Sequence, residues 1–77
     1  MEIYLTYYGR LTEITGKTSE QIEVEGVMAS DIKKKLGSMY PSLQTMQFTL
    51  AENNALLGEN DLFTSKQLDV FPPFSGG

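Results

Sequence analysis

The last segment of this 77-residue chain is its most chemically suggestive part, because Pro72 and Pro73 precede a terminal Gly76-Gly77 pair. Glycine has no Cβ, so a Gly-Gly end can pass through a slot that would stop other residues. We therefore expect the carboxylate of Gly77 to be the working group of the protein. An idle chain end is the alternative, but the residues before the glycines are apolar and ring-containing, which is not typical of a linker.

Composition excludes most forms of catalysis by the chain's own side chains. The chain has no cysteine and no histidine, which removes thiol nucleophiles, thiolate metal sites, the usual zinc ligand and the commonest general base. We expect no metal site and no cofactor bound by this chain. The first residues show no signal-peptide pattern, and no apolar run approaches membrane-spanning length. The expected setting is cytoplasmic, without membrane attachment.

Charge argues against nucleic acid as a partner. Ten acidic and six basic residues give a net charge of −4, whereas binding to phosphates needs clustered positive charge. The one basic cluster, Lys33-Lys34-Lys35, falls within a helical pattern and is interpreted as a solvated helix face. Docking of an acidic partner on this cluster is the minor alternative.

Hydrophobic patterns predict the elements that must carry the tail. In chain order they are a strand at 2–8, a turn or short helix at 11–15, a strand at 20–25, a helix at about 29–40, a strand at 46–50, a short edge strand at 55–57 and a strand at 67–71. This order predicts an α+β domain of the β-grasp (ubiquitin-like) class, with one main helix packed on one face of a mixed sheet of four to five strands. The first and last strands should be parallel neighbours in its middle.

The domain is expected to span residues 1–71, with a flexible tail at 72–77. Its expected core consists of the inward-facing apolar residues of these elements: Ile3, Leu5, Tyr7, Ile22, Val24, Ile32, Leu36, Met39, Phe48, Leu50, Leu68 and Val70. Gly37 is expected to fray the helix near its end, and Pro41 to close it. Pro72 should end the last strand, because proline has no amide hydrogen to pair.

Exposed apolar side chains should surround the start of the tail. Tyr8 and Phe71 are expected to project from neighbouring strands on the sheet face away from the helix. Together with Tyr4 and with Leu56 or Leu57, they would form an apolar patch. Such patches on small proteins usually mark an interface. We predict that this patch binds each partner of the protein in turn.

The ending resembles that of a known family. Phe71-Pro72-Pro73-Phe74-Ser75-Gly76-Gly77 is similar to the Phe-Pro-Pro-x-x-Gly-Gly ending of the MoaD-type small subunits of molybdopterin synthase, which are ubiquitin-like sulfur carriers. The opening is also similar, with Tyr7-Tyr8 at the end of a strand and a short Leu-Thr-Glu-Ile-Thr-Gly segment at 11–16. The resemblance covers the whole chain in length and element order, and it is most specific in the last seven residues.

The resemblance implies a carrier whose catalytic side chains belong to its partners. A MoeB-type adenylyltransferase, similar to ubiquitin-activating enzymes, would use ATP and magnesium to convert the Gly77 carboxylate into an acyl-adenylate. Sulfur from a persulfide would then displace AMP and leave a thiocarboxylate. In a heterotetramer, the MoaE-type large subunit would receive the tail and pass the sulfur to a pterin precursor of the molybdenum cofactor. The inserted residues would be Pro72, Pro73, Phe74, Ser75 and Gly76.

Other functions share this ending. A sulfur carrier for thiamine thiazole, tRNA thiolation or cysteine synthesis would use the same activation. A ubiquitin-like protein modifier would form isopeptide bonds through Gly77. A protein-interaction module would work without Gly76 and Gly77, whereas either carrier role needs them.

Overall fold

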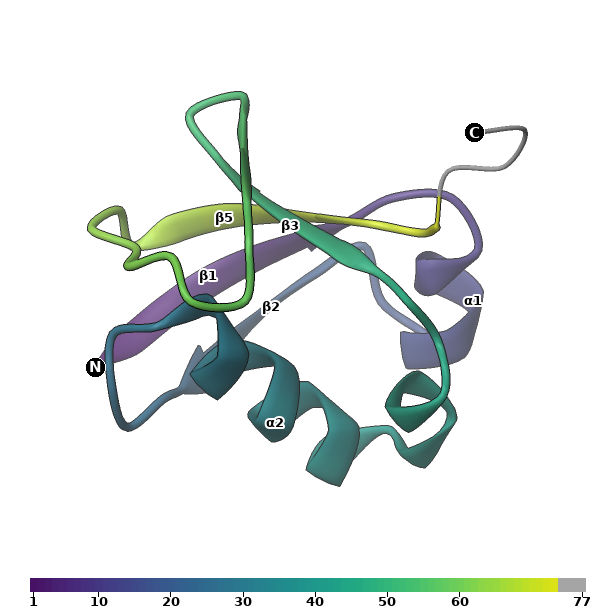
Figure 1. Cartoon of the computed structure of the whole chain (residues 1–77). Helices are drawn as coiled ribbons and strands as arrows, with labels where there is room; N and C mark the ends of the chain where they lie inside the picture. The colour runs from purple at the N-terminus through teal and green to yellow at the C-terminus, as the bar shows by residue number, and fades with distance from the viewer. Residues whose placement is uncertain (74–77) are drawn as a thin grey trace.

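A mixed sheet of five strands forms one layer of the computed structural model, which describes residues 1–73 (Figure 1). The strands are β1 (Glu2–Tyr7), β2 (Ser19–Glu23), β3 (Thr49–Glu52), β4 (Ala55–Leu57) and β5 (Gln67–Phe71). The helices are α1 (Leu11–Thr15), α2 (Ala29–Met39) and the 3₁₀ turn η1 (Pro41–Gln44). All three lie on the same side of the sheet (Figure 1), and the opposite side is called the outer face below.

The strand order is β2-β1-β5-β3-β4, which confirms the predicted β-grasp arrangement. The central pair, β1 and β5, is parallel, with Leu5 opposite Leu68 and Tyr7 opposite Val70. The other neighbouring pairs are antiparallel. The first and last strands therefore end side by side, and this places the start of the tail beside the end of β1.

The predicted core is buried, with one exception. Met39 is 36% exposed, because α2 ends there and the chain turns into η1, whose Leu43 enters the core instead. Leu11 of α1 and Phe63 of the loop before β5 also join the core, although the sequence patterns did not identify them. Short connecting segments therefore supply a substantial part of the interior.

The third strand begins at Thr49 rather than at 46. Its antiparallel register pairs Thr49 with Phe71, so the preceding residue would face Pro72, which has no amide hydrogen to donate. Phe48 is nevertheless buried and Met46 packs partly against the core. The apolar alternation at 46–50 therefore predicted burial correctly. The extent of hydrogen-bonded pairing between β3 and β5 depended instead on where β5 ends.

Gly37 does not fray α2, which continues to Met39. A Cβ at Gly37 would lie 3.2 Å from the Cγ atom of Gln44, and the Gln44 side-chain amide donates to the Gly37 carbonyl at 3.0 Å. The glycine therefore allows η1 to approach the helix closely.

Within residues 1–73, no helix is both long enough and apolar enough to cross a membrane.

Candidate functional site

The ends of β1 and β5 are joined beyond their regular pairing. The Tyr8 amide donates to the Val70 carbonyl at 3.1 Å, which brings Tyr8 beside Phe71 on the outer face. Their rings stack with centroids 4.7 Å apart and an angle of 12° between the planes. The Tyr8 hydroxyl also donates to Asp69 at 3.2 Å. This hydrogen bond is the main cause of the raised pKa of Tyr8, and it fixes the ring from its outer end.

Gly9 supports the first residue of the tail. Its φ angle of +57° lies in the left-handed region, where a residue with a side chain is strained. A Cβ at this position would lie 3.1 Å from Cγ of Pro72, which is tighter than an ordinary contact, and 3.6 Å from Cδ. The Pro72 ring therefore packs so closely on Gly9 that a side chain at position 9 would require the ring to shift.

Helix α1 fixes the backbone of Gly9 through two hydrogen bonds. The Gly9 carbonyl accepts the Thr12 hydroxyl at 2.8 Å and the Thr12 amide at 3.1 Å. The helix itself is anchored in the core through Leu11, which is fully buried, and it ends at Gly16, whose φ angle is +73°. The φ angles of both glycines that flank α1 are in the left-handed region, but of the two only Gly9 has another residue within 4 Å of where a Cβ would lie.

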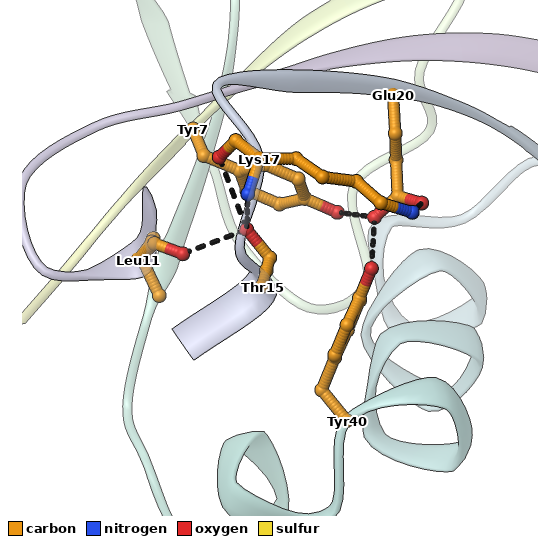
Figure 2. A network of polar contacts seen from close by, with 6 residues as sticks. All are labelled: Tyr7, Leu11, Thr15, Lys17, Glu20 and Tyr40. Carbon is orange, nitrogen blue, oxygen red and sulfur yellow. Dashed lines mark hydrogen bonds and ion pairs between the residues drawn. The ribbon is translucent and has the colours of Figure 1, made fainter. Parts of the chain in front are cut away.

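A cluster of polar side chains holds the C-terminal end of α1, on the helix side of the sheet (Figure 2). Glu20 accepts the hydroxyl of Tyr7 at 2.5 Å and that of Tyr40 at 2.6 Å. Its other oxygen pairs with the Lys17 ammonium at 3.0 Å. The Thr15 hydroxyl bonds to the backbone of Leu11 and Lys17. The cluster therefore ties α1, β1, β2 and the end of α2 together.

Burial and hydrogen bonding compete at Glu20. Desolvation alone would raise the pKa of its carboxyl group, but hydrogen bonds from Tyr40, Tyr7 and Lys17 outweigh this effect and lower the pKa. Desolvation, followed by the hydrogen bond to Glu20, raises the pKa of Tyr7. Tyr40 is affected in the same way. The cluster is thus most stable with an ionised glutamate and neutral tyrosines.

The predicted interface residues occupy different positions on the sheet. Tyr4 is 51% exposed on the outer face, where its partners in the neighbouring strands are Gln21 and Gln67. Leu56 is 60% exposed, whereas Leu57 packs partly against the core. The stacked pair of Tyr8 and Phe71 is therefore the apolar surface that adjoins the tail, and Tyr4 and Leu56 lie elsewhere.

Pro73 lines a surface hollow on the other side of the tail exit. Arg10, Ile14 and Met46 contribute to the same hollow, which combines a positive charge with apolar side chains. Sequence reasoning missed Arg10, and it interpreted Gly9 only as the end of a strand. The remaining predicted tail residues, Phe74, Ser75, Gly76 and Gly77, lie outside the described residues.

The described residues place a packed aromatic pair and the first two tail residues at one end of the sheet. Among residues 1–73, no group of three or more acidic side chains is placed to hold a metal ion, and the full sequence has neither histidine nor cysteine. What the geometry provides at this end of the sheet is a rigid platform, from which Pro72 and Pro73 lead toward the terminal glycines.

No family model matches the chain, and no curated protein is a significant sequence match. Solved structures match its fold. Small archaeal modifier protein 1 (SAMP1) from Haloferax volcanii is 19% identical, with a TM-score of 0.78 and 100% of each chain covered.

Two further structures span almost the whole chain. A Pyrococcus furiosus protein, provisionally described as molybdopterin converting factor, subunit 1, is 19% identical, with a TM-score of 0.80 over 96% of this chain and 99% of that one. SAMP1 from Methanosarcina acetivorans is 19% identical, with a TM-score of 0.74 over 99% and 96%. These likenesses establish the ubiquitin-like β-grasp fold.

Proposed function

We propose that this chain is a ubiquitin-like sulfur carrier whose Gly77 carboxylate is activated and loaded by a partner enzyme. The observation that carries the proposal is the arrangement at the end of β5. The strand stops at Phe71, the Pro72 ring rests on Gly9, and the chain then continues into Phe-Ser-Gly-Gly. A narrow, reactive end would thus leave the domain beside a stacked aromatic pair.

The proposed reaction begins with adenylation. A carboxylate does not react with a sulfur nucleophile, because its oxygen is a poor leaving group. Transfer of AMP from ATP to the Gly77 carboxylate releases pyrophosphate and makes an acyl-adenylate. We place ATP and magnesium on a MoeB-type adenylyltransferase.

Sulfur then replaces AMP. The terminal sulfur of a donor persulfide attacks the acyl carbon, AMP leaves, and an acyl disulfide forms. A second thiol attacks the donor's sulfur in that bond. The products are a thiocarboxylate on Gly77 and a disulfide between the donor and the second thiol.

The described residues contribute rigidity and binding surface to this reaction. The fixed φ angles of Pro72 and Pro73 reduce the conformational entropy that the chain loses when it enters a slot. Tyr8 and Phe71 offer paired rings, and aromatic side chains are enriched in protein interfaces. Because one surface adjoins one tail, we propose that the activating enzyme and the acceptor enzyme bind it in turn and exclude each other.

For the acceptor, we propose a MoaE-type large subunit of molybdopterin synthase, assembled with this chain as a heterotetramer. The ending of residues 71–77 supports this assignment through its resemblance to MoaD-type subunits. The similar fold of the Pyrococcus furiosus protein described as a molybdopterin converting factor subunit agrees with it. Thiamine thiazole, tRNA and cysteine synthesis are the alternative destinations of the sulfur.

Protein modification is the second candidate function, because two of the similar structures are small archaeal modifier proteins. It would begin with the same acyl-adenylate. A cysteine thiol of the enzyme would displace AMP to form a thioester, and a lysine amine of a target would displace that thiol. The product would be an isopeptide bond to Gly77 rather than a thiocarboxylate.

The deciding experiment is mass spectrometry of the C-terminal tryptic peptide. The full chain is incubated with an activating enzyme, ATP, magnesium and a persulfide donor. Cleavage after Lys66 gives peptide 67–77, which contains no methionine. This matters because methionine oxidation nearly mimics the mass gain of an oxygen-to-sulfur exchange. An exchange that a thiol alkylator can modify supports the carrier.

Each other outcome has a defined meaning. Lysine conjugates of Gly77 without a thiocarboxylate would replace the carrier with the modifier. An unchanged peptide, with several enzymes each shown to be active on its own carrier, would overturn both carrier functions. The protein-interaction module would then be the better description.

A further inference from the structure

The start of the tail is held by the end of β1, and the two contacts involved lie on consecutive residues. Tyr8 holds Phe71 by ring stacking and by its backbone bond to Val70. Gly9 has no side chain, and the Pro72 ring packs in the space that a Cβ at this position would enter. We call these two residues, Tyr8 and Gly9, the tail seat.

The tail seat does not depend on the tail for its own structure. The Gly9 carbonyl is bonded to the first turn of α1 through Thr12, and that helix is anchored in the core by Leu11. The hydroxyl of Tyr7, the residue that precedes the tail seat, donates to Glu20 at 2.5 Å on the opposite face of the sheet. The seat is therefore part of the rigid domain, and the Pro72 ring has to fit it.

We propose that Gly9 is a positioning residue, which sets the direction in which the tail leaves the domain and so aims Gly77 at the nucleotide site of the activating enzyme. This inference rests on the proposed carrier function. It assigns a role to a residue that makes no contact with the reacting atoms, and it makes the Gly9–Pro72 contact a determinant of how well the carrier is recognised.

The physical reason is the stiffness of the two prolines. Pro72 and Pro73 have fixed φ angles, so a displacement of the first ring also displaces Pro73 and changes the direction in which the chain leaves the domain. The activating enzyme would then have to bend the displaced chain back toward its nucleotide site, and the binding energy used for this purpose would no longer contribute to affinity for the carrier. A methyl group at position 9 would lie 3.1 Å from Pro72 Cγ, so the Pro72 ring would have to move by a few tenths of an ångström.

The chain offers a matched control for this test. Gly9→Ala and Gly16→Ala both place alanine in a left-handed conformation, at φ angles of +57° and +73°, and each costs about 1–2 kcal/mol of folding free energy. A Cβ at Gly16 would meet nothing within 4 Å, whereas one at Gly9 would meet Pro72. Any difference beyond stability between the two variants therefore reports the contact with the tail.

The measurement is ATP–pyrophosphate exchange, with the carrier concentration varied to separate KM from kcat. We expect Gly9→Ala to raise the KM for the carrier about tenfold relative to Gly16→Ala, because part of the binding energy is used to redirect the tail. The kcat values of the two variants should agree within about twofold. Circular dichroism at the assay temperature confirms that both variants are folded.

A rescue experiment completes the test. Pro72→Ala removes the Cγ and Cδ atoms that a Cβ at Gly9 would meet. In that background, Gly9→Ala should have no more effect on KM than Gly16→Ala. Equal KM values for the two single variants, or an effect of Gly9→Ala that persists with Pro72→Ala, would overturn the positioning role. Failure of the wild-type chain to support any exchange would instead overturn the carrier function, so the two failures are distinguishable.

Discussion

The ring of Tyr8 stacks on the ring of Phe71, with the centroids 4.7 Å apart and the planes 12° from parallel. These residues lie 63 positions apart by number, and the parallel pairing of β1 with β5 brings them together. The stack stands at the point where the tail leaves the sheet. It therefore links the packing of the central strands to the surface that a partner would meet.

Replacing Tyr8 by alanine should weaken binding to the activating enzyme. The substitution removes one of the two stacked rings from the proposed contact surface, and tyrosines are enriched among the interface residues whose truncation costs about 1 kcal/mol or more of binding energy. We expect the Kd to rise about tenfold in isothermal titration calorimetry, with cooperative unfolding retained. Tyr8→Phe, which keeps the ring and loses the bond to Asp69, should bind within about threefold of the wild type.

Tyr4→Ala is the matched control for that experiment. Tyr4 is also an exposed tyrosine of the outer face, but polar residues of the neighbouring strands lie opposite it. We expect a smaller loss of affinity than for Tyr8→Ala. If the two alanine variants bind equally well, the interface is not centred on the stacked pair.

Glu20 should make stability depend on acid pH. Its folded-state pKa lies below the ordinary value of 4.5, so its ionised form stabilises the protein above about pH 4.5. This contribution is lost as the pH falls through the folded-state pKa. We expect Glu20→Gln to be less stable by about 1–3 kcal/mol at pH 7, and the difference from the wild type to shrink below pH 4.5 in urea titrations.

An exposed carboxylate controls for the change in net charge. Glu13 lies on the surface of α1, and Glu13→Gln should alter the free energy of unfolding by less than about 0.5 kcal/mol at pH 7. A stability difference between Glu20→Gln and the wild type that is constant from pH 7 to pH 3 would contradict the role given to the ionised Glu20.

Alanine at Gly37 should bring less stability than helix propensity predicts. In an open helix the change from glycine to alanine stabilises by about 1 kcal/mol, but here the new methyl would lie 3.2 Å from Gln44 Cγ. We expect the gain to be smaller in the wild-type chain than in a Gln44→Ala background, as measured by a double-mutant cycle in urea. Equal gains in both backgrounds would show that η1 adjusts without cost.

Deleting Gly76 and Gly77 should separate carrier function from folding. The buried core lies between Ile3 and Val70, so the truncated chain should unfold within about 2 °C of the full chain in calorimetry. Exchange of ATP and pyrophosphate in the presence of the activating enzyme should fall to the background level. Undiminished exchange would show that the Gly77 carboxylate is not the group that reacts.

The sequence by itself determined the element types, their order and most of the core. Period-two alternation identified the sheet faces of β1, β2 and β5, and the i, i+4 spacing of Ile32 and Leu36 identified the inner face of α2. These signals are local, because the side-chain direction follows directly from backbone geometry. The double proline and the Gly-Gly pair are equally local, and so the tail was identified as the candidate site without a structure.

Only the tertiary structure decided which residues support that tail. The sequence predicted that Tyr8 and Phe71 project from neighbouring strands, but their ring stacking and the close approach of Gly9 to Pro72 depend on the register of β1 and β5, which no local pattern encodes. The same is true of Gly37, whose neighbour Gln44 belongs to the next element. The physical reason is that packing depends on residues distant in sequence, whereas periodicity and turn chemistry report only on neighbours along the chain.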